Sequence, residues 1–102
     1  MTKNTALVLG GEPECLEVEV DGKTYRIPLA DYMPMADAKT MLQIKRMPAK
    51  ERDGAYTEFF FSYFERYIGE EPFNKLTSKD FETMMDGWNK ANDAEGSAET
   101  GE

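Results

Sequence analysis

The chain has 102 residues, enough for one small domain with a modest core and too few for two independent cores. Its formal net charge is −8, and the acidity is uneven: residues 1–53 carry 8 basic and 9 acidic side chains, whereas residues 54–102 carry 4 and 11. Such a surface is repelled by phosphate, which argues against nucleic acid and membrane surfaces as partners and favours another protein.

Cysteine and histidine usage limits the chemistry. The chain has one cysteine, Cys15, and no histidine, which excludes an intramolecular disulfide, a thiolate zinc site and an imidazole general base. No phosphate-binding loop or nucleophile motif occurs either. The apolar run Ala6–Leu9 is shorter than the hydrophobic region of a signal peptide. We therefore expect a cytoplasmic protein that is not an enzyme and has no cofactor or metal.

Residues 15–28 predict a β-hairpin, because apolar and charged side chains alternate on both sides of Asp21-Gly22, a dipeptide typical of two-residue turns. The predicted register places these residues opposite each other: Val18 and Tyr25, Leu16 and Ile27, Glu17 and Arg26. Pro28 should end the second strand. Whether Ala6–Leu9 adds a third strand is left open. A hairpin needs cover for its apolar face, and helices should provide it.

Three helices are expected, over about 36–47, 50–69 and 78–92. The first should present one stripe and stop at Pro48; the stripe comprises Ala38, Met41, Leu42 and Lys45, broadened by Ile44. The second carries a full helical face of large side chains and ends at Gly69; the face comprises Tyr56, Phe59, Phe60, Tyr63, Phe64, Tyr67 and Ile68. Most of this face should be core, whereas Phe61 lies off it and is a candidate for a partner contact.

In the last helix, Thr77 and Asp80 resemble a capping box, and Phe81, Met84, Met85 and Trp88 form a stripe. This stripe either completes the core or contributes to an adaptable binding surface. Glu82 and Asp86 should form a solvated face. We expect one α+β domain over residues 1–92 and a disordered acidic tail over 93–102.

A hairpin ending in "YRIPL", followed by helices and by the pattern Leu76-Thr77-x-x-Asp80-Phe81-x-x-Met84-Met85-x-x-Trp88, resembles the tail assembly chaperones of long-tailed bacteriophages and prophages. The residue-level match runs from Leu76 to Trp88. The resemblance implies a non-enzymatic role in virion assembly in the host cytoplasm: binding the tape measure protein, keeping it soluble and bringing tail tube protein to it.

The candidate partner-binding residues are Phe61, Tyr63, Met84, Met85 and Trp88. Phe61 and the methionines could equally form a self-association face, so a homo-oligomer is left open. The alternative function is an acidic decoy that mimics DNA, or another phage or bacterial regulatory module, because the C-terminal half is strongly acidic.

Overall fold

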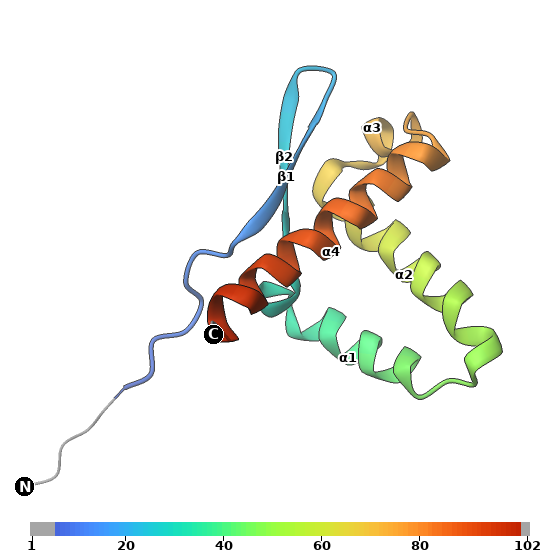
Figure 1. Ribbon diagram of the computed structural model, residues 1–102. Coiled ribbons are helices and arrows are strands. Elements are labelled where there is room, and N and C mark those ends of the chain that lie inside the picture. Colours follow the sequence, from blue (N-terminus) through green and yellow to red (C-terminus); the bar gives the residue numbers. More distant parts are fainter. Residues whose placement is uncertain (1–5, 101–102) are drawn as a thin grey trace, which may run out of the picture.

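The computed structural model describes the backbone of residues 6–100 and the side chains of residues 6–94. In chain order, the elements are β1 (Cys15–Val20), β2 (Lys23–Pro28), a 3-10 turn (Ala30–Tyr32), α1 (Met35–Lys45), α2 (Ala49–Ile68), α3 (Glu70–Asn74) and α4 (Ser78–Thr100). The hairpin crosses behind α4, while α1, α2 and α4 enclose the middle of the molecule (Figure 1). The predicted α+β fold, a hairpin followed by a mainly helical part, is confirmed.

The hairpin forms in the predicted register, with Val18 opposite Tyr25, Leu16 opposite Ile27 and Glu17 opposite Arg26. Its turn residues Asp21 and Gly22 have φ angles of 52° and 83°, as a type I′ turn requires. Within residues 6–100 the sheet has these two strands alone, so Ala6–Leu9 does not add a third. Leu7, Val8 and Leu9 instead form an arm whose side chains are 83%, 93% and 84% exposed.

The carbonyl of Pro28 joins the hairpin to two helices. The hydroxyl of Tyr63 on α2 and the indole N–H of Trp88 on α4 both donate to it, each at 2.9 Å. The N–H of Leu29 donates to the carbonyl of Glu14, so Leu29 and Glu14 form a hydrogen-bonded pair. Hydrogen-bonded and non-hydrogen-bonded pairs alternate along an antiparallel ladder, and the neighbouring pair, Cys15 and Pro28, is therefore not hydrogen-bonded. The Pro28 carbonyl therefore points away from β1 and is available to the two side chains.

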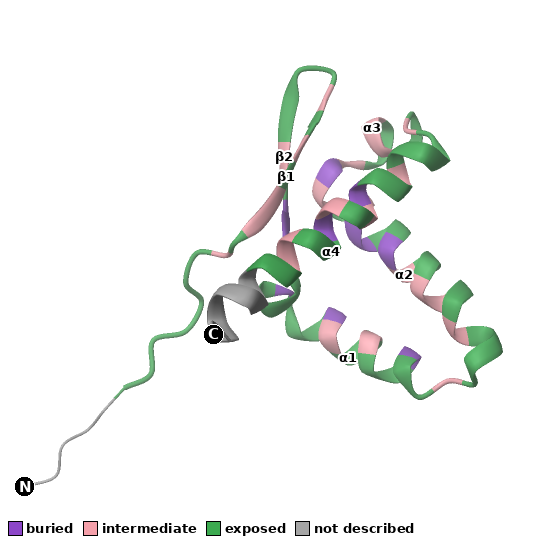
Figure 2. Ribbon diagram, viewed as in Figure 1, coloured by how far each residue is buried: buried purple, intermediate pink, exposed green. Residues whose placement is uncertain are grey.

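The core lies where β2, α2 and α4 meet, and buried positions occur on the sides of α2 and α4 that face each other (Figure 2). Its buried members are Ile27, Leu29, Met33, Phe60, Tyr63, Phe64, Ile68, Met84 and Trp88. Tyr56, Phe59 and Tyr67 pack against this cluster and are partly buried. The prediction that the aromatic face of α2 is mostly core is confirmed.

The predicted stripe of α1 is wrong in part. Leu42 is 49% exposed and Lys45 is exposed, whereas Ile44 and the acidic Asp37 are buried. Asp37 accepts two hydrogen bonds from the guanidinium of Arg66 on α2, at 2.6 and 2.8 Å. This bidentate pair turns the Asp37 side of α1 towards α2, and the hydrogen bond to Asp37 raises the pKa of Arg66 above its usual range.

The boundaries of α4 follow the prediction at one end and differ at the other. The Thr77 N–H donates to the Asp80 carboxylate at 2.9 Å and the Asp80 N–H donates to the Thr77 hydroxyl at 3.1 Å, which is a reciprocal capping box. At the other end the helix continues to Thr100, through most of the segment that we expected to be a disordered tail. Alanine and glutamate occupy half of positions 93–100 and favour a helix, no proline interrupts the segment, and Gly96 is accommodated within the helix despite its low propensity. The rest of the predicted tail, residues 101–102, lies outside the described residues.

The connection between α2 and α4 contains the short helix α3, which was not predicted. Gly69 separates α2 from α3 with a φ angle of 103°, a conformation that favours glycine. Its N–H still donates to the carbonyl of Glu65 at 2.7 Å, which closes the last turn of α2. The predicted end of α2 at Gly69 is therefore confirmed, and the chain turns there into α3 without an intervening loop.

Candidate functional site

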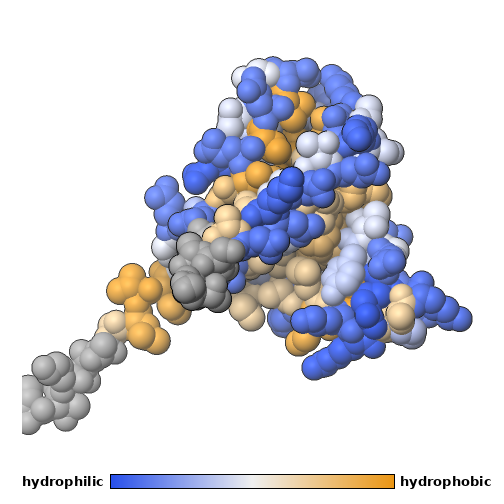
Figure 3. Space-filling model, in the orientation of Figure 1, coloured by the Kyte–Doolittle hydropathy of each residue, from blue (hydrophilic) through white to orange (hydrophobic). Residues whose placement is uncertain are grey.

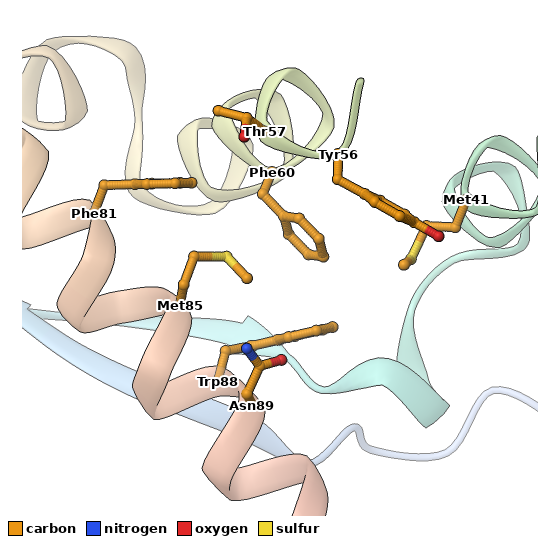
Figure 4. Close-up of a pocket in the computed structure, with 8 residues that line it drawn as sticks. All are labelled: Met41, Tyr56, Thr57, Phe60, Phe81, Met85, Trp88 and Asn89. Atoms are coloured by element: carbon orange, nitrogen blue, oxygen red, sulfur yellow. The ribbon is translucent and has the colours of Figure 1, made fainter. Parts of the chain in front are cut away.

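An open apolar groove of about 330 Å³ lies between α1, α2 and α4 (Figure 4). Its lining comprises Met41 from α1, Tyr56, Thr57 and Phe60 from α2, and Phe81, Met85, Trp88 and Asn89 from α4. The volume is at the lower end of the range for ligand sites, about 300–1,000 Å³. In the space-filling view, a hydrophobic area occupies the middle of the molecule between hydrophilic regions (Figure 3).

The floor of the groove belongs to the core. Phe60 and Trp88 are 6% and 4% exposed, and their ring centroids lie 5.1 Å apart in an edge-to-face arrangement. The hydrogen bond from Trp88 to Pro28 fixes the indole at this position. The hydrogen bond and the ring contact together hold the floor of the groove in one arrangement.

The walls of the groove are less buried than its floor. Met41, Tyr56, Phe81 and Met85 are all partly exposed. Methionine side chains are flexible and polarizable, so Met41 and Met85 can adapt to partner side chains of different shape. A rigid aromatic floor between adaptable walls suits the apolar face of a protein segment.

Polar groups in the groove are few and lie at its edge. Thr57 and Asn89 are exposed, and the Thr57 hydroxyl donates to the carbonyl of Asp53 at 3.0 Å. The lining residues include no carboxylate, amine, guanidinium or thiol, and their hydroxyl groups are those of Tyr56 and Thr57. The rest of the groove offers apolar contact area.

One edge of the groove is acidic. Glu82 and Asp86 are exposed on α4, and each lies three residues before a lining residue, Met85 and Asn89 respectively. Residues three apart are neighbours on a helix surface, so both carboxylates lie next to the groove. Exposed Lys79 and Lys90 lie on the same side of α4, three residues before Glu82 and four after Asp86. Among the described side chains, neither lysine lies within ion-pair distance of these carboxylates. A basic segment along this edge would therefore meet two unpaired carboxylates with a lysine at each end.

A second hollow of about 390 Å³ lies on the other side of Phe81, between α2 and the segment that includes α3 and the start of α4. Phe61 is 43% exposed there, and its ring centroid lies 4.8 Å from that of Phe81 and 6.4 Å from that of Phe73. Phe81 lines both hollows and separates them.

The structure separates the predicted partner-binding residues into two groups. Met85 lines the groove, and Phe61 is exposed at the second hollow. Tyr63, Met84 and Trp88 are 0%, 6% and 4% exposed, so they are core residues, and Trp88 reaches the groove only as part of its floor. Their burial follows from the junction at Pro28 and from the position of Met84 on the inner side of α4.

Sequence reasoning did not identify Met41, Tyr56 or Phe81 as groove residues, although each was assigned to an apolar stripe. For two of them the signal was a position at a margin: Tyr56 is the first residue of the stripe on α2, and Phe81 is the first on α4. Met41 stands inside its stripe and gave no such signal. Residues at the end of a stripe lie beyond the closest approach of two crossing helices and keep part of their surface exposed.

Other kinds of site find no support in the described residues. Within residues 6–94, no group of three or more histidine, cysteine, aspartate and glutamate side chains could hold a metal ion. None of the described helices is long and apolar enough to cross a membrane. Comparison with protein-family models, curated proteins and solved structures gives no match.

Proposed function

We propose that the chain is a non-enzymatic tail assembly chaperone that holds an amphipathic helix of the tape measure protein in the groove between α1, α2 and α4. The observation that carries the proposal is the combination of an apolar groove with an acidic edge at Glu82 and Asp86. Grooves of this kind bind helices whose apolar residues recur every three or four positions.

The groove also defines the chemistry of its client. Apolar side chains of the client helix would lie over the floor formed by Phe60 and Trp88, while lysine or arginine side chains on its flank would lie along the acidic edge of α4. A tape measure protein is expected to be long, helical and prone to aggregate, so covering its apolar surface would keep it soluble.

The resemblance covers the helix α4, which forms one side of the groove. Within the pattern from Leu76 to Trp88, the capping residues Thr77 and Asp80 fix the start of α4. Phe81, Met85 and Trp88 line the groove. In this proposal, the client is bound in the bacterial cytoplasm and tail tube protein is then brought to the chaperone–client complex.

Co-expression with the tape measure protein of the same phage or prophage tests the proposal. We expect the native chain to raise the soluble fraction of the tape measure protein and to co-purify with it. Met85→Glu places a carboxylate in the apolar wall of the groove, next to the carboxylate of Glu82. The two carboxylates repel each other, and a bound helix would remove water from the new one. We expect this variant to lower the captured amount by more than about tenfold.

Thr83→Glu is the matched control, because Thr83 is exposed on the same helix and lies about 200° around its axis from Met85. It adds the same charge outside the groove, so capture should be unchanged. Thermal melts of both variants must match that of the native chain. Equal capture by two folded variants, or no capture by the native chain, contradicts the proposal.

A further inference from the structure

The outer face of α1 carries an exposed stripe of apolar and basic residues, which we call the α1 stripe: Met35, Lys39, Leu42 and Arg46. These residues are four, three and four positions apart and so lie on one face of the helix. Met35 and Leu42 are 72% and 49% exposed, which is unusual for two large apolar side chains on one face. Val8 and Leu9 of the arm line a hollow together with Met35, and the exposed Glu12 and Asp31 also line it.

The charge of the α1 stripe has one sign. The only acidic residue of α1, Asp37, is buried and paired with Arg66, so the exposed charges of α1 and its last turn are Lys39, Lys45 and Arg46. Among the described residues, neither Lys39 nor Arg46 lies within ion-pair distance of a carboxylate. The stripe is thus an apolar helix face flanked by positive charge, in a chain whose net charge is −8.

The groove has the complementary chemistry, with an apolar lining and the carboxylates of Glu82 and Asp86 along its edge. We infer that the α1 stripe of one copy of the chain docks in the groove of a second copy. Met35 and Leu42 would enter the apolar groove, while Lys39 and Arg46 would meet Glu82 and Asp86 of the second copy.

One helix can take part in both contacts. Met41, which lines the groove of its own copy, and Leu42, which belongs to the stripe, are successive residues and therefore point about 100° apart. Leu42 lines a hollow with Met41 and Tyr56, so the stripe adjoins the groove. Two copies related by a twofold axis would each place a stripe in the other's groove and close a dimer, whereas a head-to-tail contact would add further copies until a ring closes or a filament grows.

A contact made by one helix face is small, and interfaces below about 1,200 Å² belong to the weak, transient class. Self-association through the groove goes beyond the proposed function but uses the same groove. A client helix and a second copy would therefore compete, and client binding would dissociate the assemblies. In the absence of client, self-association would keep the apolar groove covered.

Sedimentation velocity on the purified chain, without any client, tests the inference. The native chain should form species larger than a monomer in a concentration-dependent way, and added salt should weaken them. Two charge-reversal variants are compared with it: Lys39→Glu with Arg46→Glu on the stripe, and Glu82→Lys with Asp86→Lys on the groove edge. Each places like charges across the contact and should weaken association by more than about tenfold. All four residues are exposed, so both variants should fold, although Arg46→Glu places a negative charge at the negative end of the α1 dipole and should lower the melting temperature slightly.

An equimolar mixture of the two variants tests directly whether the stripe of one copy contacts the groove edge of another. The acidic stripe of the first variant matches the basic groove edge of the second, and the remaining stripe and groove edge form a native pair. The mixture should therefore recover the association that each variant lacks alone. A native chain that stays monomeric at all concentrations overturns the inference. So does a variant that associates as the native chain does, or a mixture of folded variants that does not recover association. Because no client is present, failure here leaves the proposed client binding untouched.

Discussion

The Pro28 carbonyl is the point at which β2, α2 and α4 are joined, and its two donors can be removed one at a time. Tyr63→Phe deletes the hydroxyl without changing the packing of the ring, and Trp88→Phe deletes the indole N–H together with part of the ring. In the native chain both donors lie 2.9 Å from the oxygen, and the position of Pro28 in the ladder leaves this carbonyl without a backbone donor from β1.

The size of the effect depends on whether the carbonyl keeps one donor. With Trp88 present, Tyr63→Phe should lower the free energy of unfolding by about 0.5–1.5 kcal/mol, the net worth of one hydrogen bond. In a Trp88→Phe background the same change leaves the buried carbonyl with neither donor, and the cost should rise to about 1–3 kcal/mol. Trp88→Phe and the double variant lose the same packing of the indole ring, so this loss cancels in the double-mutant cycle.

The assay is urea denaturation of the native chain, the two single variants and the double variant. Unfolding is followed by circular dichroism at the helical minimum, because Trp88 is the only tryptophan and fluorescence would be lost with it. We expect a coupling free energy of about 0.5–2 kcal/mol, with the double variant less stable than the sum of the singles. Additive effects within about 0.3–0.5 kcal/mol would refute the assignment of both donors to one otherwise unpaired carbonyl.

Three further predictions concern stability. Arg66→Met should lower the free energy of unfolding by about 1–2 kcal/mol, because buried Asp37 loses two hydrogen bonds while solvent screens the half-exposed guanidinium; an unchanged urea midpoint would contradict this. Thr77→Ala should cost about 1 kcal/mol through the lost cap, and Thr77→Ser should restore most of it, as thermal melts would show. Burial raises the pKa of the Tyr63 hydroxyl in the folded chain above the value of 10.0 in the unfolded chain. The neutral hydroxyl therefore favours the folded state fully below pH 10.0, and this contribution to the free energy of unfolding is lost as the pH rises above that value. In alkaline urea titrations, Tyr63→Phe should therefore lose less stability than the native chain, and equal losses would count against the burial effect.

The hairpin could be predicted residue by residue because every local signal agrees. The alternation of side chains, the Asp21-Gly22 turn and the position of Pro28 all specify one register, and the structure has that register. The capping box at Thr77 and Asp80 and the end of α2 at Gly69 are also local features, set by residues within one helical turn. Features of this kind need no knowledge of the rest of the chain.

The orientation of α1 could not be predicted, because it depends on a residue in another helix. Apolar periodicity alone favours burying Leu42, whereas the pair between Asp37 and Arg66 turns that residue outwards. An aspartate in the first turn of a helix is ordinarily assigned to solvent or to the helix dipole. A partner 29 residues away in the chain leaves no trace in the local pattern.

The groove could be predicted from the sequence only in part. The sequence indicated that Met85 and its neighbours could be either core or contact surface, and the structure divides them by their position around α4. Met84 and Trp88 are buried in the core, with Trp88 also forming the floor of the groove, while Met85 is partly exposed in the groove wall. This division depends on how α1, α2 and α4 cross, which side-chain periodicity does not specify.

Methyl spectra of the chain labelled with ¹³C at its methionine methyl groups, recorded during titration with a helical segment of the tape measure protein, test the central claim most directly. Four of the described methionines report on two environments: Met41 and Met85 line the groove, whereas Met33 and Met84 are buried in the core. The account predicts saturable shifts of the Met41 and Met85 resonances, with smaller changes at Met33 and Met84. Binding of the segment that leaves both Met41 and Met85 unshifted would contradict the assignment of the groove as the client site.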